Sequence, residues 1–267
     1  MRIDQRELDE LQSVVQAMAP YLDQIVLVGG WAHRLFQMHP WARERDFVPL
    51  TTRDLDFAIP ASAREVAPGP LSSLLEQAGY KPLHKSIYTR PPLMRYQKEA
   101  GLQVEFIANL SGGRTHREEI AAVLEVAGVT AEQLRFVYPL EVRPWSPAVP
   151  ELRGVRVANP VAYLFQKVLV SPRRSSRDKA AADLLYVADT ADLFGDHLGE
   201  LAAEWSEVAR QLHPKHVATF RKVAKVLSSP SDLHRQAAEI AVAIGRPRPP
   251  DALAQVVEQI MRAVFKE

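Results

Sequence analysis

Two carboxylates lie two residues apart in the segment Thr52-Arg53-Asp54-Leu55-Asp56-Phe57-Ala58-Ile59. The apolar residues predict a β-strand, in which residues i and i+2 point to one face, roughly 6.5–7 Å apart along the chain. Asp54 and Asp56 held in this way could share divalent metal ions, and such ions serve phosphate chemistry. The alternative is a strand end with polar side chains in solvent, because a chain this acidic should contain about four such pairs by chance.

Upstream, a short β-branched run, Gln24-Ile25-Val26-Leu27-Val28, is followed by Gly29-Gly30 and by a segment with helical periodicity. In a unit of strand, two glycines and helix, backbone N–H groups can face a phosphate, because glycine permits close approach. A tight turn without a ligand is an equally good interpretation of the two glycines alone. Their spacing matches neither a dinucleotide-binding fingerprint nor a Walker loop.

Downstream, residues 102–108 alternate so that Glu105 lies on the face opposite Val104 and Phe106. The flanking apolar residues are typical of an inner strand. A carboxylate in such a place needs a partner, because burial of an unpaired charge is costly or shifts its pKa. A metal ion shared with Asp54 and Asp56 is expected to supply one.

These three segments, in this order, resemble the nucleotidyltransferase superfamily of the polymerase-β type. Its signature is an apolar strand, Gly-Gly or Gly-Ser, a helix, Asp-x-Asp/Glu on a strand, and a third acidic residue in a later strand. The resemblance implies catalytic and metal-binding roles for Asp54, Asp56 and Glu105, and contact of Gly29 and Gly30 with the nucleotide. Many members have Ser where this chain has Gly30, so the backbone must serve here without a side-chain hydroxyl.

The stretch between Gly30 and Asp54 is long for this signature. It is expected to be a surface loop, with a role in acceptor choice as the alternative. Its aromatic and basic residues include Trp41, Arg43, Arg45 and Arg53.

A second group of residues extends the resemblance to about residues 23–190. Residues 159–170 predict a helix entered through Pro160, with Lys167 in an otherwise apolar pattern. The layout that follows, with Arg173-Arg174, Arg177-Asp178-Lys179 and Asp183-Leu184-Leu185, looks like the AbiEii/MenT-like branch, the nucleotidyltransferase toxins and their uncharacterised relatives.

In that branch a lysine at this place neutralises triphosphate charge, which implies this role for Lys167, whereas the sequence alone favours a lysine whose head reaches water from an apolar helix. Arg173, Arg174 and Lys179 could add to the positive field, or form a solvated face. Asp183 could be a further acidic site residue, or it could pair with Lys179 one helical turn away.

Composition sets outer bounds on function. The chain has 267 residues, 47% hydrophobic residues, a net charge of +1 and no cysteine. A disulfide framework, a thiolate nucleophile and a cysteine-ligated zinc site are therefore excluded. The near-zero net charge limits any nucleic-acid contact to a local basic patch. No apolar run of about 18 residues occurs, so a cytoplasmic protein without a membrane segment is expected.

The pattern along the chain predicts an α+β fold, in which a mixed β-sheet domain flanked by helices (residues 1–158) precedes an α-helical domain (residues 159–267). The resemblance implies that the first of these is the nucleotidyltransferase domain. A helix is expected over residues 4–18 with Asp4 as N-cap, and two or three antiparallel strands over residues 80–108. We further expect a helix over residues 114–127 and extended structure from Phe136 to Val157. Beyond Pro160 the pattern is helical, with breaks near residues 172, 195, 214, 230 and 245–250.

The resemblance implies an enzyme that moves an NMP from an NTP to an acceptor hydroxyl with Mg²⁺ or Mn²⁺. The acceptor could be RNA, such as tRNA, or a protein, as in toxin-antitoxin relatives, in which case a cognate antitoxin is a possible partner. Transfer to a small molecule such as an aminoglycoside is the first alternative. A non-catalytic nucleotide-binding module is the second.

Overall fold

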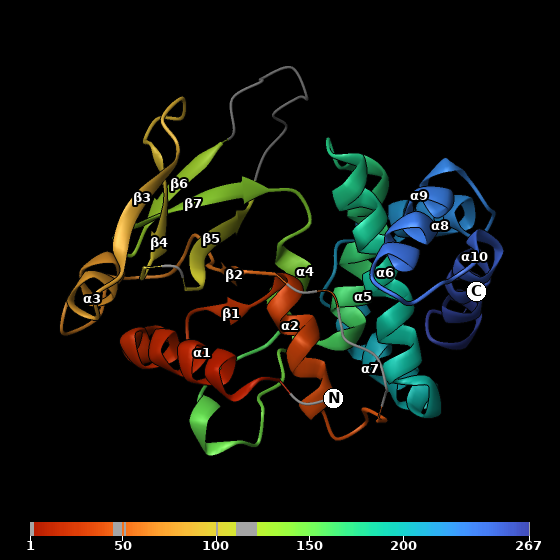
Figure 1. Cartoon of the computed structure of the whole chain (residues 1–267), viewed down its shortest axis with the longest axis horizontal. Coiled ribbons are helices and arrows are strands. Elements are labelled where there is room, and N and C mark those ends of the chain that lie inside the picture. Colours follow the sequence, from red (N-terminus) through yellow and green to blue (C-terminus); the bar gives the residue numbers. More distant parts are fainter. Residues whose placement is uncertain (1–2, 45–49, 51, 100, 111–121, 267) are drawn as a thin grey trace. The chain divides into compact units, whose positions relative to one another are not determined.

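The computed structural model describes residues 3–44, 50, 52–99, 101–110 and 122–266 (Figure 1). Contacts divide the chain into two compact units. The first, which we call the sheet unit, comprises Arg2–Leu35 and Thr51–Ala158. The second, the helical unit, comprises Phe36–Leu50 and Asn159–Glu267. The chain thus passes between the units after Leu35, after Leu50 and after Ala158.

The sheet unit is built on a mixed seven-stranded sheet. Its strand order is β1-β2-β5-β4-β3, with β7 also paired to β5 and β6 paired to β7. β2 and β7 each run parallel to β5, and the other pairs are antiparallel. The strands are β1 (Val26–Leu27), β2 (Asp54–Ala58), β3 (Lys81–Ser86), β4 (Leu93–Gln97), β5 (Gln103–Asn109), β6 (Val123–Val126) and β7 (Val129–Leu134). The predicted α+β fold class is confirmed.

The helices of the sheet unit are short apart from the first. They are α1 (Gln5–Ala17), α2 (Gly29–Leu35), α3 (Leu71–Gln77) and α4 (Tyr138–Glu141), with 3₁₀ turns η1 (Ala19–Tyr21) and η3 (Pro150–Leu152). The predicted N-terminal helix is confirmed: Asp4 accepts a hydrogen bond from the backbone N–H of Arg6, which satisfies one of the free donors at the start of α1.

One face of the sheet is apolar, as the alternation of its strands predicts. Phe57 on β2, Phe106 on β5 and Tyr96 on β4 are almost fully buried and contact one another, with ring centroids 6.2 and 6.3 Å apart. The residues between them along each strand therefore point to the opposite, polar face.

The prediction of a helix over residues 114–127 is wrong for the part of this segment that the structure describes. Residues 123–126 form β6, which pairs with β7 through the two-residue turn Ala127-Gly128. Both turn residues have positive φ, 49° and 81°, the combination that suits a tight hairpin. The rest of the expected helix, residues 114–121, lies outside the described part of the chain.

The segment from Phe136 to Val157 is less extended than expected. It contains the short helix α4 and the turn η3. Its extended contacts are bridges of Val157 to Leu27 and to Trp145. Prolines at the first turn of both α4 and η3 favour these helical turns, since their φ is already helical.

The helical unit confirms the predicted pattern of helices and breaks. Its helices are α5 (Pro160–Val170), α6 (Arg177–Leu193), α7 (Leu198–Ala209), α8 (Pro214–Leu227), α9 (Asp232–Ala243) and α10 (Pro250–Ala263), with 3₁₀ turns η2 (Phe36–Met38), η4 (Ser171–Arg173) and η5 (Gly195–His197). Every residue of α5 is buried, so this helix is the centre of the unit. Each described helix of the chain is too short or too polar to span a membrane.

The segment Phe36–Leu50, expected in the first domain, groups with the helical unit because of its side-chain contacts. Phe36 packs edge-on against Tyr163 and Phe194, with centroids 5.2 and 5.8 Å apart. Arg43 donates from Nε to the carbonyl of Asp192 (2.6 Å) and from Nη1 to Asp196 (3.0 Å). Arg45, also noted in this segment, lies outside the described residues.

Candidate functional site

Asp54 and Asp56 lie on the polar face of β2, at the start of the strand. Asp54 is exposed and Asp56 is half-buried, whereas Leu55 between them is fully buried. The backbone N–H of Asp54 donates to Thr52 Oγ1 (3.1 Å), which orders the chain just before the strand. The two carboxylates therefore share one face, as the spacing predicts.

Gly29 lies directly against Asp56. Its φ is +67°, and a Cβ added to it would be 2.2 Å from Asp56 Oδ2. The preceding N–H, that of Val28, donates to the carbonyl of Asp56 (2.9 Å). Gly29 is thus required both for its backbone conformation and for space. The structure thus brings Gly29 against Asp56, which lies 27 residues later in the sequence. Gly30 is buried within α2.

Glu105 is the register partner of Asp56 in the parallel pair of β2 and β5. Register partners share a face and lie about 4.7–4.9 Å apart across the sheet, so the Glu105 side chain emerges beside that of Asp56. The Glu105 side chain is only 9% exposed. The third predicted carboxylate is therefore next to the first two, on the same face.

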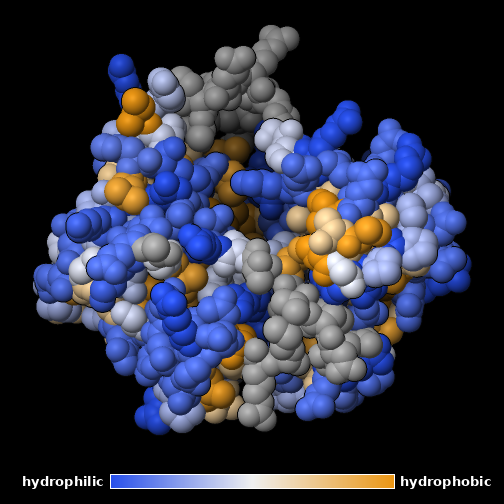
Figure 2. Space-filling model, viewed as in Figure 1, coloured by the Kyte–Doolittle hydropathy of each residue, from blue (hydrophilic) through white to orange (hydrophobic). Residues whose placement is uncertain are grey.

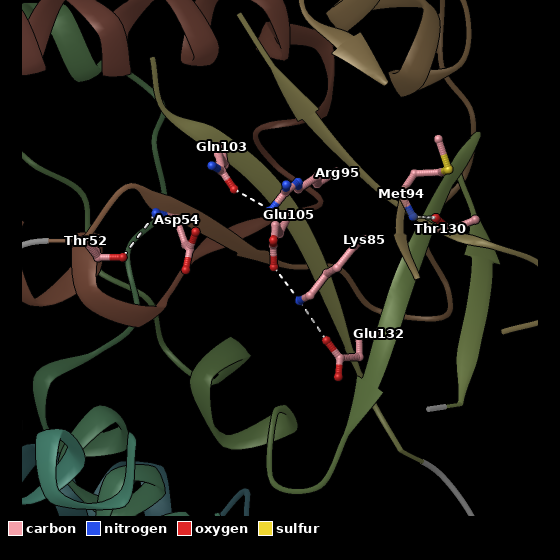
Figure 3. A network of polar contacts seen from close by, with 9 residues as sticks. All are labelled: Thr52, Asp54, Lys85, Met94, Arg95, Gln103, Glu105, Thr130 and Glu132. Atoms are coloured by element: carbon pink, nitrogen blue, oxygen red, sulfur yellow. Dashed lines mark hydrogen bonds and ion pairs between the residues drawn. The ribbon is translucent and has the colours of Figure 1, made fainter. Parts of the chain in front are cut away.

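The partner of Glu105 in this structure is Lys85, from β3 (Figure 3). Lys85 Nζ lies 2.5 Å from Glu105 Oε2 and 2.9 Å from Glu132 Oε2 on β7. Burial lowers the pKa of Lys85, but its hydrogen bonds to the two carboxylates and their charges outweigh burial and raise the pKa above its usual range. Lys85 is therefore a permanent cation at physiological pH.

The same face continues with a second polar pair beside Asp54. Gln103 is the register partner of Asp54, and its Oε1 accepts from Arg95 Nη1 on β4 (2.8 Å) (Figure 3). The polar face thus changes from acidic on β2 to basic on β4 and β3.

A divalent metal fits the two aspartates, because carboxylate oxygens on one face are the hard ligands that Mg²⁺ and Mn²⁺ prefer. A three-carboxylate centre is less well prepared. Within the part of the chain that the structure describes, no three acidic or histidine side chains are grouped so that they could hold an ion. Glu105 is held by Lys85 instead, and its predicted role as a metal ligand stays a prediction.

Lys167, on α5 of the helical unit, also has a carboxylate partner. Its Nζ lies 2.6 Å from Asp183 Oδ1 on α6, and it lies over the rings of Tyr163 and Tyr186. Arg174 Nε binds the other oxygen of Asp183 (2.8 Å). Asp183 therefore pairs with Lys167 and Arg174, and Lys179 is exposed on the first turn of α6.

Comparison with known families decides the class of this protein. A family model described as nucleotidyltransferase matches residues 9–211, well over half of the chain. The chain belongs to this nucleotidyltransferase family. The protein is thus an enzyme of the nucleotidyl transfer type. No curated protein and no solved structure matches the chain.

The nucleotidyltransferase match begins within α1 and ends after α7, so it includes residues of both units. Every residue predicted for the site falls inside it. These are Gly29, Gly30, Asp54, Asp56, Glu105, Lys167, Arg174 and Lys179.

Lys85 and Glu132 of this nucleotidyltransferase are not among the site residues predicted from the sequence. Lys85 lies 20 residues before Glu105 in the chain, and the two meet because β3 and β5 both lie beside β4 in the sheet. The strand period places Lys85 on the same face as Leu83, whose register partner is Arg95. One signal was available: a buried glutamate requires a cation, and the segment before β5 is rich in lysine and arginine.

Proposed function

We propose that this nucleotidyltransferase transfers an NMP from an NTP to an acceptor hydroxyl, with a divalent metal held by Asp54 and Asp56. The observation that carries the proposal is the contact of Asp56 Oδ2 with Gly29. It brings a glycine backbone, which a phosphate can approach closely, against the carboxylates that would hold the metal. When bound, the metal supplies positive charge to the phosphate oxygens.

In the proposed reaction, the acceptor oxygen forms a bond to the α-phosphorus as the bond between that phosphorus and the bridging oxygen breaks. Pyrophosphate leaves with the electron pair, and the hydroxyl proton passes to a carboxylate or to water. Asp54 and Asp56 would hold the metal, whose charge would act on the reacting phosphate, and the Gly29-Gly30 backbone permits close approach of that phosphate. Such catalysis comes mainly from positioning and from charge neutralisation.

The roles predicted for Glu105 and Lys167 both require that the residue leave or share its present ion-pair partner. Glu105 can complete the metal site or accept the proton only if its carboxylate leaves Lys85. Lys167 can neutralise a triphosphate only if it shares or gives up Asp183. Two cations, Lys167 and Arg174, contact this one carboxylate and form with it a cluster of basic side chains. With exposed Lys179, it supports a role in binding anions, which the AbiEii/MenT resemblance suggests.

Among acceptors, we place RNA first because of the β3–β4 hairpin. Residues 81–98 contain five lysines and arginines and no acidic residue. Tyr88 is 81% exposed, and hydrophilic residues surround a small hydrophobic spot in the area over β3 (Figure 2). Basic groups with an exposed aromatic ring are typical of surfaces that bind single strands. A protein acceptor, an aminoglycoside-like molecule and a non-catalytic module are the alternatives, and a cognate antitoxin stays a prediction.

The proposal is tested by incubation of the purified protein with each α-³²P-labelled NTP, Mg²⁺ or Mn²⁺, and total RNA or protein extract. We expect label in the RNA fraction, and none with Asp54→Asn. Label in protein alone would reject the RNA acceptor and keep the transfer activity. Failure of every NTP to raise the thermal unfolding temperature in the presence of metal would favour the non-catalytic module.

A further inference from the structure

Arg95 is a cation on the polar face of the sheet, and among the described residues it has no carboxylate partner. Its Nη1 donates to the neutral side chain of Gln103 (2.8 Å), and its Nε is buried without an acceptor in the described part of the chain (Figure 3). A buried donor without a partner costs free energy, and such groups are rare in folded proteins. The Arg95 guanidinium therefore has hydrogen-bonding capacity that the described residues do not use.

The strand register makes the lack of a partner for Arg95 unusual. Tyr96 pairs with Val104 in the antiparallel ladder of β4 and β5. The next residues on the two strands, Arg95 and Glu105, are therefore neighbours on the opposite, polar face. A neighbouring glutamate is a natural partner for an arginine, but Glu105 Oε2 is held by Lys85 at 2.5 Å. Arg95 donates to a neutral side chain instead, so its charge is available to another anion.

The glycine backbone and Arg95 lie on opposite sides of the aspartate pair. Gly29 follows β1, which borders β2 on one side, and lies against Asp56. β5 borders β2 on the other side. There Gln103 is the register partner of Asp54 and holds the Arg95 guanidinium (Figure 3). The face thus offers a close-approach backbone on the β1 side and a guanidinium on the β5 side.

These two sides suit the two partners of a transfer reaction. In phosphoryl transfer the attacking and leaving oxygens lie roughly in line, on opposite sides of the phosphorus. With the triphosphate along the Gly29-Gly30 backbone, as in the proposed function, pyrophosphate leaves on the β1 side. The acceptor hydroxyl then approaches from the β5 side, where Arg95 lies.

We propose that Arg95 binds a phosphate of the acceptor, and so selects an acceptor that carries phosphate next to its hydroxyl. The end of an RNA strand has this chemistry, because the nucleotide with the terminal 3′ hydroxyl carries a phosphate at its 5′ position. A guanidinium matches phosphate oxygens with its fork of N–H donors. An aminoglycoside is a cation, and Arg95 would repel it. The inference rests on the proposed function for the direction from which the acceptor approaches.

The test is the affinity for a single-stranded RNA 12-mer with a fluorescein at its 5′ end and a free 3′ hydroxyl, measured by fluorescence anisotropy with Mg²⁺ at several KCl concentrations. Arg95→Gln should raise the Kd at least about tenfold. It should also make the fall of log K with log [KCl] less steep by about 0.7, as expected for loss of one phosphate contact on a single strand. Arg6→Gln, at an exposed arginine on α1, should change neither. An unchanged salt dependence in Arg95→Gln would overturn the inference.

A modified RNA tests the same contact on the wild-type protein, so this test does not depend on the folding of a variant. A neutral methylphosphonate in place of the 3′-terminal linkage should weaken binding by about tenfold. The same replacement at the 5′-terminal linkage should change the Kd by less than about twofold, because that linkage lies far from the hydroxyl that reacts. Equal effects at the two ends, or a wild type that does not bind the RNA, would overturn the inference.

Transfer kinetics separate this inference from the proposed function. With labelled NTP and total RNA, Arg95→Gln should raise the KM for RNA and change the KM for NTP by less than about twofold. A rise in the KM for NTP alone would assign Arg95 to the triphosphate, which would overturn the inference and leave the proposed function intact. A wild type that binds RNA through Arg95 but transfers no label would instead contradict the proposed function.

Discussion

Lys167 and Asp183 form an ion pair inside the helical unit, with 2.6 Å between Nζ and Oδ1 and side chains 6% and 3% exposed. Asp183→Asn leaves Lys167 without its charged partner in a buried place. We expect a loss of about 3–5 kcal/mol in the free energy of unfolding, as for other broken buried pairs. Urea unfolding followed by circular dichroism measures it, with exposed Asp178→Asn on the same helix as the control.

Lys167→Met should cost less than Asp183→Asn, because Asp183 keeps Arg174 as a partner at 2.8 Å. The methionine also fits the contact with the rings of Tyr163 and Tyr186. Equal losses in the two variants would show that Arg174 does not compensate for Lys167.

Gly29→Ala places a methyl group against Asp56 Oδ2 and forces a positive φ on a residue with a Cβ. The strain should lower the free energy of unfolding by about 1–3 kcal/mol, and displacement of Asp56 should weaken Mn²⁺ binding. Gly199→Ala is the matched control, since its Cβ meets nothing within 4 Å and it lies in α7. In this helix alanine should be neutral or slightly stabilising. Differential scanning calorimetry should therefore show a lower unfolding temperature for Gly29→Ala and no decrease for Gly199→Ala.

Asp54→Asn should reduce nucleotidyl transfer at least about a hundredfold, because a neutral amide would neither hold the proposed metal nor offset its charge. Asp54 is exposed, so the unfolding temperature should not fall. Initial rates with the best NTP give the comparison, and Asp251→Asn, at another exposed aspartate, should keep full activity. Comparable rates for the two variants would remove Asp54 from the site.

Glu141 on α4 provides a prediction for pH. Burial raises its pKa from 4.5 to about 7, against the opposing charge of Arg156. The folded state thus binds the proton more tightly than the unfolded state, and this stabilisation is full below pH 4.5 and lost as pH rises through 7. Glu141→Gln should abolish this pH dependence of stability, so that the wild type becomes less stable than the variant by about 3 kcal/mol at pH 8.5. Urea unfolding at pH 5 and 8.5 checks the sign.

Local patterns predicted most elements of this fold, because each carried its own signal. Asp4 before an amphipathic stretch marked α1, and Pro160 after Asn159 marked α5. Residues 123–126 were assigned wrongly because a stretch as short as Val123-Leu124-Glu125-Val126 fits either a helix or a strand. Their strand identity depends on pairing with β7, which is tertiary information.

The site shows the same division between local and tertiary information. The place of Asp54 and Asp56 on one face follows from the strand period alone. The contact of Gly29 with Asp56 and the pairing of Asp56 with Glu105 depend on strand register, which the sequence does not state. Lys85 was missed because its contact with Glu105 depends on the strand order β5-β4-β3, which is tertiary information.

The threefold passage of the chain between the units restricts how this enzyme can be divided. A fragment ending at Ala158 would retain Phe36 and Arg43 without Tyr163, Phe194 and Asp196, their partners in the helical unit. A fragment beginning at Asn159 would in turn lose an aromatic side chain from its core. Truncation at one point therefore damages both halves, and a clean separation requires residues 36–50 to be grafted onto the C-terminal fragment through a new linker.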